Sequence, residues 1–361
     1  MAARRYSQGP SRRKYWLIAA GAAFLVALSL LVPYQGHPES VTLVIQQGMS
    51  RYAIANELCD HGVLYSRWPF LFYAYTRPVR TLKAGEYVFD RPLSSVEVFR
   101  RLERGEVRLY PLRIPEGLTR WEIANEVARM QLASQEAFLA ATEDTKLIRE
   151  LAPEATTLEG YLFPDTYSFA RPSDPAQIVR TMVDRFRRVY ESLQNPNANP
   201  HKLKTHELVT LASLVEKETG LAGERGLVAA VFYNRLERGI MLACDPTVIY
   251  AKRLANEGAF DGYIRVSDLE RQSPYNTYLK AGLPPGPIAS PGRASMEAAL
   301  SPPASKYLYF VSNTQGGHFF AATSAEHARN VARYRRLRAE QEREQSKQAA
   351  RAPQAGSAPR R

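Results

Sequence analysis

The chain has 361 residues and a formal net charge of +12, a value that at first suggests a nucleic-acid-binding protein. Residues 1–14 contain five basic and no acidic side chains, and residues 335–361 contain eight basic and three acidic ones. Only +2 remains for residues 15–334, which excludes a strongly basic folded domain and argues against nucleic acid as a partner.

Residue types that bind metals are few and scattered. The two cysteines, Cys59 and Cys244, are far apart and predict buried, unpaired thiols rather than a disulfide framework or a zinc site. The six histidines form no HExxH motif, and His201 and His206 lack the i, i+4 spacing of a helical metal pair. We therefore predict neither a metal ion nor another cofactor.

Residues 15–36 contain no charged side chain. About 20 apolar residues in a helix suffice to cross a bilayer, and residues 15–34 nearly supply them, with aromatic residues at both ends. The basic residues before them place the N-terminus in the cytoplasm. A cleavable signal peptide is the alternative, but LVPYQG is a poor cleavage site. We expect a cytoplasmic tail at 1–14, a single anchor at 15–34 in the cytoplasmic (inner) membrane, and the rest of the chain in the periplasm.

A repeat with an offset of 69 residues follows: VIQQGMSRYAIANEL at 44–58 matches RIPEGLTRWEIANEV at 113–127. Each copy predicts a short strand, a glycine turn and a helix that begins at Ser50 or at Thr119, where Thr119-x-x-Glu122 is a capping box. With a further strand ending at Phe89, residues 37–108 resemble a LysM module, a small βααβ fold that binds glycan. A scaffold without glycan binding is the alternative.

The C-terminal part predicts a β-hairpin and then a helix. Residues 307–313 alternate as a strand, and residues 318–323 return as its partner after a Gln-Gly-Gly turn. A helix is expected from Thr323 to about Arg335. Residues 336–361 are predicted to form a disordered basic tail, because they cannot bury enough apolar surface to fold.

The best amphipathic helix in the chain is predicted at residues 205–219. Its apolar face consists of Leu208, Leu211, Ala212 and Val215. The opposite polar face consists of His206, Thr210, Ser213 and Lys217. Glu216 and Glu218 lie on opposite borders of the apolar face, so both cannot enter one site. An apolar border and a C-terminal turn raise the pKa of the Glu218 carboxyl, as a general acid requires. An ordinary structural glutamate is the alternative.

The segment LASLVEKET at 211–219 resembles the signature of the endolytic murein transglycosylases, the MltG or YceG-like family. Further segments that fit the family in the right order are LEGYLFPDTYSF at 158–169, VFYNRL at 231–236, DPTVIY at 245–250, SPYNTY at 273–278, GLPPGPIASPG at 282–292, and YLYFV at 307–311 with GGHF at 316–319. The resemblance extends from the anchor to about residue 335.

The resemblance implies an α+β protein with a YceG-like catalytic domain at 109–335. It implies a membrane-anchored enzyme that cleaves the β-1,4 bond between MurNAc and GlcNAc inside peptidoglycan strands. Glu218 matches the catalytic glutamate, paired with Thr219, and Glu216 is the second candidate. One carboxyl is enough because the C6 hydroxyl of the same MurNAc attacks C1 and leaves a 1,6-anhydroMurNAc end, whereas ordinary glycosidases need two carboxyls. A role in ending nascent strands would imply contact with penicillin-binding proteins.

Residues 273–292 are expected to form the wall of a cleft, because seven of the eleven residues at 282–292 are glycine or proline. The substrate-binding candidates in it are Tyr275 and Tyr278, which can stack on sugars, and Asn276 and Thr277, which can bind hydroxyl or N-acetyl groups. Core packing is the alternative for the aromatic rings. Weaker substrate-binding candidates are Glu159, Tyr161, Asp165 and Asp245, the last of which could simply start a turn or a helix.

Two other functions compete with this interpretation. A non-catalytic, membrane-anchored scaffold that binds peptidoglycan would retain the LysM-like module and need no general acid. A serine enzyme acting on the peptide stems is disfavoured, because the only SxxK motif, Ser11–Lys14, precedes the anchor and no GxSxG is present.

Overall fold

The computed structural model describes residues 12–37, 39–77, 81–194, 199, 201–255 and 262–351. Its helices are combined with three two-stranded sheets, which confirms the predicted α+β class. The chain divides into two compact units, Met1–Pro111 with Ser168–Ser173 and Leu112–Tyr167 with Asp174–Arg361. Residues 1–11 of the predicted tail at 1–14 lie outside the described residues. The last ten residues of the predicted C-terminal tail also lie outside them.

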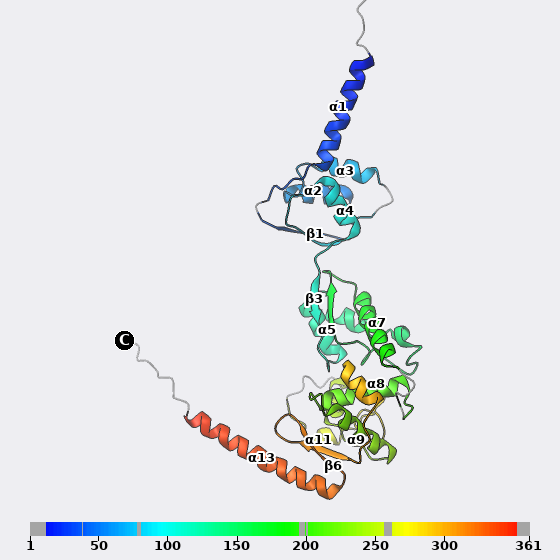
Figure 1. Ribbon diagram of the computed structural model, residues 1–361, viewed down its shortest axis with the longest axis vertical. Helices are drawn as coiled ribbons and strands as arrows, with labels where there is room; N and C mark the ends of the chain where they lie inside the picture. The colour runs from blue at the N-terminus through cyan, green and yellow to red at the C-terminus, as the bar shows by residue number, and fades with distance from the viewer. Residues whose placement is uncertain are drawn as a thin grey trace, which may run out of the picture. The chain divides into compact units, whose positions relative to one another are not determined.

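The first unit has a βααβ core followed by one more helix (Figure 1). Its elements are α1 (Arg12–Leu31), β1 (Val41–Ile45), α2 (Arg51–Asp60), α3 (Arg67–Tyr75), β2 (Gly85–Phe89) and α4 (Ser95–Arg104). β1 and β2 are antiparallel, with Val41 opposite Phe89 and Ile45 opposite Gly85. Apolar side chains from both strands and from α2, α3 and α4 form one buried cluster. The strand and helix order predicted for this region is confirmed.

Helix α1 contacts α3 and α4 of the same unit, and most of its apolar side chains from Tyr15 onward are exposed. Within the described residues, none of the helices combines the length and the apolar character that a membrane crossing requires.

The second sheet consists of the strands β3 (Tyr110–Arg113) and β4 (Thr166–Phe169). Between them lie α5 (Arg120–Arg129), α6 (Gln135–Ala141) and the 3-10 helix η1 (Thr145–Ile148), so the second copy of the repeat also has the order strand, two helices, strand. Thr119 and Glu122 form the predicted capping box at the start of α5. The sequence repeat therefore corresponds to a repeated element order.

The second unit is built around α8, which packs against α9, α10 and α12. Its remaining helices are α7 (Pro175–Leu193), α8 (Thr205–Glu218), α9 (Arg225–Glu237), α10 (Asp245–Leu254), α11 (Val266–Leu269) and α12 (Arg293–Leu300). A long irregular segment between α11 and α12 contains the predicted cleft wall.

The C-terminal hairpin has the predicted form, but the helix after it is longer than expected. β5 (Tyr309–Ser312) and β6 (His318–Ala321) are antiparallel, and α13 runs from Ser324 to Arg351 as one continuous helix (Figure 1). The expectation of a disordered chain from residue 336 is therefore wrong as far as residue 351. Good helix formers and ion pairs such as Arg338–Glu342 at 3.0 Å sustain a helix that needs no core of its own.

Candidate active site

Helix α8 carries both candidate carboxylates and is buried on almost every side. Its predicted apolar face is in the core, but His206, Thr210 and Ser213 of the predicted polar face are buried too. The sequence pattern suggested that this polar face would be free of packing, and the structure corrects that. Polar side chains in a buried position need hydrogen-bond partners, and here another segment of the chain supplies them.

The glycine- and proline-rich segment 282–292 lies against this polar face of α8. The Ser213 hydroxyl accepts a hydrogen bond from the Ile288 N–H at 3.1 Å. The His206 Nε2 is 2.9 Å from the Pro285 carbonyl oxygen, and its Nδ1 is 2.7 Å from the Tyr161 hydroxyl. Tyr161 is fully buried, so it supports this packing and is not available to a sugar, contrary to our expectation.

Glu216 has the environment of a structural carboxylate. Its side chain is only 7% exposed, and its Oε1 is 3.8 Å from the Arg225 guanidinium. Its Oε2 accepts a hydrogen bond of 2.9 Å from the backbone N–H of Gly292, the N-cap residue of α12. Glu216 is therefore held by Arg225 and by the start of α12, as a structural carboxylate is.

Glu218 is the last residue of α8, and its surroundings are different. Burial raises the pKa of its carboxyl to about 7, with a further rise from the nearby charge of Asp245. A hydrogen bond from the Cys244 thiol and the positive charge of Arg235 oppose this rise in pKa. Within the described part of the chain Glu218 forms no ion pair at salt-bridge distance, so it can hold a proton near neutral pH.

Cys244 and Asp245 at the start of α10, together with the loop at 275–278, lie around the Glu218 carboxyl. The Tyr278 hydroxyl donates a hydrogen bond to Asp245, and the Thr277 hydroxyl accepts one of 2.9 Å from the Cys244 N–H. Burial raises the pKa of Tyr278 most, the contacts with Asp245 raise it further, and the nearby charge of Glu218 adds a smaller rise. The predicted residues Asp245, Thr277 and Tyr278 are thus brought together with Glu218.

Asn276 does not have the role that we expected. Its side chain is fully buried. Its amide donates hydrogen bonds of 2.8 Å to the carbonyls of Leu269 and Arg271, and its Oδ1 accepts one from the Tyr278 N–H. Asn276 therefore holds the loop together and has no surface left for a sugar. Thr277 is 1% exposed and likewise acts within the protein.

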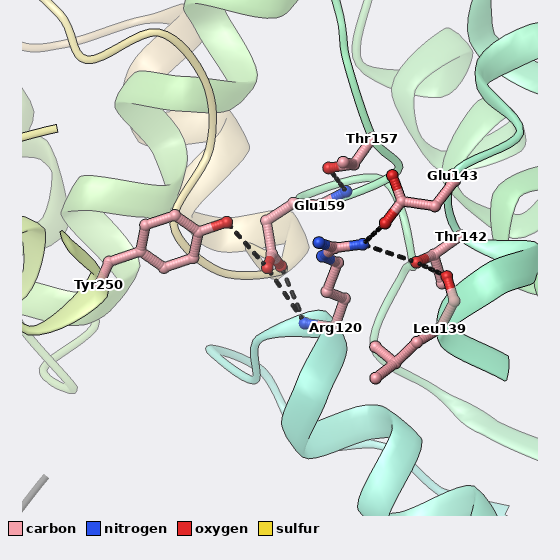
Figure 2. A network of polar contacts seen from close by, with 7 residues as sticks. All are labelled: Arg120, Leu139, Thr142, Glu143, Thr157, Glu159 and Tyr250. Carbon is pink, nitrogen blue, oxygen red and sulfur yellow. Dashed lines mark hydrogen bonds and ion pairs between the residues drawn. The ribbon is translucent and has the colours of Figure 1, made fainter. Parts of the chain in front are cut away.

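Glu159 is the centre of a second polar network (Figure 2). Both of its carboxyl oxygens accept hydrogen bonds from the Arg120 N–H, at 3.0 and 3.2 Å, and one also accepts the Tyr250 hydroxyl at 3.2 Å. Burial raises the pKa of this carboxyl to about 7, against the effect of these donors. The Arg120 guanidinium in turn contacts Thr142 and Glu143. Glu159 is 3% exposed, so it joins α5 to α10 instead of touching substrate.

The remaining predicted residues are more dispersed. Thr219 is buried at the C-terminus of α8, where its hydroxyl accepts the Leu221 N–H at 3.1 Å. Tyr275 lies 4.9 Å, ring to ring, from Tyr250. Asp165 pairs with Arg185 at 2.7 Å near the start of β4 and is not part of the Glu218 site. We find no group of three or more metal-ligating side chains in the described ranges.

A cleft of about 590 Å³ borders the site. It is lined by Thr119, Trp121, Glu122, Asn125, Lys217, Pro246, Ile249, Tyr250, Lys252, Arg253 and Ile288. Of its lining residues, Lys217 and Pro246 are the chain neighbours of Glu218 and Asp245, which do not themselves line it. Trp121 and Tyr250 give it aromatic walls of the kind on which sugar rings stack.

Sequence reasoning missed several residues of the site. Arg235 is anchored by hydrogen bonds to the carbonyls of Leu308 at 2.6 Å and Leu242 at 2.7 Å, which hold it near Glu218. For Cys244 the sequence predicts only a buried, unpaired thiol. Arg235 and Tyr250 belong to the family-like segments VFYNRL and DPTVIY, so the motifs contained both residues. The motifs do not indicate which of their side chains lie near the candidate acid.

The chain belongs to the YceG-like family: the family model matches residues 43–333. The matched residues include Glu218 and the aromatic cleft.

Relatives that are named for an activity are similar over most of the chain. A protein of Bacillus subtilis (strain 168) named endolytic murein transglycosylase is 33% identical over 331 residues, 87% of this chain and 90% of that protein. A Streptococcus pneumoniae protein of the same name is 31% identical over 352 residues, which are 88% of this chain and 63% of that protein. The crystal structure of a YceG-like protein from Listeria monocytogenes matches with a TM-score of 0.52 and 34% identity, over 81% of this chain and 99% of that one.

Proposed function

We propose that this protein is a lytic transglycosylase that cleaves murein (peptidoglycan) within its glycan strands, with Glu218 as the single acid and base. The family membership and the names of the relatives support the reaction class. The observation that carries the assignment of the residue is the contrast within α8, where Glu216 is ion-paired while burial raises the pKa of Glu218 to about 7.

The reaction needs one carboxyl that acts twice. Protonated Glu218 gives its proton to the glycosidic oxygen between MurNAc and GlcNAc, and the bond from that oxygen to C1 of MurNAc breaks. The C6 hydroxyl of the same MurNAc then attacks the positively charged C1, and the Glu218 carboxylate takes the hydroxyl proton. Glu218 ends protonated, no water is consumed, and the product end is 1,6-anhydroMurNAc. The nucleophile belongs to the substrate, so its effective concentration is high without a second carboxyl.

Neighbouring residues support this cycle. The Asp245 charge, held in place by the Tyr278 hydroxyl, favours the protonated form of Glu218 before the reaction and also favours a positive charge at C1. Thr219 ends the helix at the acid and thereby sets its position. Trp121 and Tyr250 in the cleft wall would hold the sugars next to it.

The test compares two variants with nearly the same shape. The Glu218→Gln variant should lose at least 1,000-fold in the rate of anhydro-end formation from purified murein, measured by mass spectrometry, because an amide cannot give or take the proton. The matched Glu216→Gln variant should retain measurable activity and melt at a lower temperature, because Arg225 loses one of its two carboxylate partners, Glu216 and Glu116. Equal activity of Glu218→Gln and the unaltered protein would overturn the assignment.

We further propose that residues 15–34 anchor the chain in the cytoplasmic membrane, with the N-terminus in the cytoplasm and the catalytic unit in the periplasm. This proposal is supported by the absence of charge from residue 15 to residue 36 and by the exposed apolar side chains of α1. Glycan binding by the LysM-like module and contact with penicillin-binding proteins stay predictions.

A further inference from the structure

The cleft beside the candidate acid has an excess of positive charge. Its charged lining residues are three cations, Lys217, Lys252 and Arg253, and one carboxylate, Glu122. The Glu122 carboxylate accepts the N–H of Thr119 at 2.7 Å and its hydroxyl at 2.8 Å, so it is already used in the helix cap. The cleft is therefore suited to an anionic group, although a glycan backbone consists mainly of neutral hydroxyl and N-acetyl groups.

Only one of these cations is held in place and still has its hydrogen-bond donors available. Lys252 is paired with Asp268 at 3.0 Å, and Lys217 donates to the Gly117 carbonyl at 3.2 Å. The Arg253 guanidinium lies 5.6 Å from the centre of the Trp121 ring, and within the described part of the chain it has neither a hydrogen bond nor an ion pair.

The other side of this arrangement is rigid. The Arg120 guanidinium lies 4.8 Å from the same Trp121 ring and is itself held by Thr142 and Glu143. Figure 2 shows how the Glu159 carboxyl connects the start of α5, at Arg120, to Tyr250 of α10. α10 is also the helix that carries Arg253. Trp121 therefore contacts both guanidinium groups, and the cation–π contact restricts the Arg253 guanidinium before any ligand binds.

We propose that Arg253 binds a carboxylate of the peptide stem that murein strands carry, so that the cleft recognises the stem as well as the sugars. A planar guanidinium with free donors matches a carboxylate by two parallel hydrogen bonds. Lys217, at the acid end of the same cleft, adds positive charge without forming a competing pair. This assignment rests on the proposed murein substrate and makes Arg253 a specificity-determining residue for it.

The direct test is binding, independent of cleavage. A synthetic stem pentapeptide with free carboxylates and the same peptide with its carboxylates amidated are titrated into the full chain, with heat release as the readout. The unaltered protein should bind the free-carboxylate peptide about tenfold or more tightly than the amidated one. The Arg253→Gln variant should bind both equally weakly. Equal binding of both peptides by the unaltered protein, or a preference kept by Arg253→Gln, overturns the proposal.

Two controls separate this inference from folding and from the proposed function. Arg238→Gln, which changes an exposed arginine at the end of α9, should keep the full preference. Arg253→Lys, which retains the charge but loses the planar donors, should keep part of it and confirm that the cleft still folds. A protein that prefers the free-carboxylate peptide yet releases no anhydro ends from murein would retain the stem site and overturn the proposed reaction.

Discussion

Glu216 and Glu218 are separated by one residue and have opposite chemical environments. On a helix wheel they lie on two borders of one apolar face, so the wheel alone does not distinguish them. The structure gives Glu216 an ion pair with Arg225 and a backbone N–H, whereas Glu218 has the Cys244 thiol, the Asp245 carboxylate and the charge of Arg235 without an ion pair in the described part of the chain. The difference arises from segments that are distant in sequence, the start of α12 on one side and the start of α10 on the other.

The surroundings of Glu218 predict two opposite shifts in the pH profile. A general acid must be protonated, so kcat/KM should decline as pH rises through about 7. The Asp245 charge raises the pKa of Glu218, so Asp245→Asn should lower that pKa and move the decline to lower pH. The Cys244 thiol lowers the pKa of Glu218 by donating a hydrogen bond, so Cys244→Ala should move the decline to higher pH.

The measurement is kcat/KM from pH 5 to 9 with solubilised murein. Asp245→Asn keeps an oxygen for the Tyr278 hydroxyl, so the loop contact should survive and the shift should come from charge alone. If both variants shift the decline of kcat/KM at high pH in the same direction, Glu218 is not the group whose titration causes that decline.

At the scale of elements, the position of α8 depends on an irregular segment. Residues 282–292 were expected to form a cleft wall because glycine and proline exclude regular structure, and they do lie beside the helix that carries the acid. Their contacts with α8 are backbone groups hydrogen-bonded to buried side chains, which sequence periodicity cannot reveal. The polar face of a helix normally contacts solvent, whereas the polar face of α8 contacts a packed loop.

Helix α13 allows a prediction about where the fold ends. Its first part packs on the hairpin, with the His327 ring 5.0 Å from Tyr309 and Arg333 4.3 Å from the Phe319 ring. A chain that stops after Arg329 should therefore melt about 2–8 °C lower, because it loses the Arg333 and Asn330 contacts. A chain that stops after Glu344 should melt at the same temperature as the full protein. Calorimetry of both truncations checks this, and an equal loss from both would place the boundary beyond residue 344.

For the whole molecule, the charge distribution and the apolar segment lead to a prediction about location. The full chain should float with phospholipid vesicles in a density gradient and resist extraction by alkaline carbonate, because residues 15–34 would be buried in the bilayer. A version that begins at residue 37 should stay in the soluble fraction and still release anhydro ends. Membrane flotation of the shortened version, or soluble behaviour of the full chain, would contradict the anchor.

The sequence by itself determined the class of protein, the α+β composition, the repeated strand–helix order and the short list of candidate acids. These features depend on local patterns, caps, turns and ordered motifs, which act over a few residues. Only the tertiary structure gave Glu216 and Glu218 their different environments, turned Asn276, Tyr161 and Glu159 into supporting residues, and brought Arg235 and Cys244 close to Glu218. The physical reason is that a pKa and a free donor depend on burial and on neighbours from distant segments, and those exist only after the chain has folded.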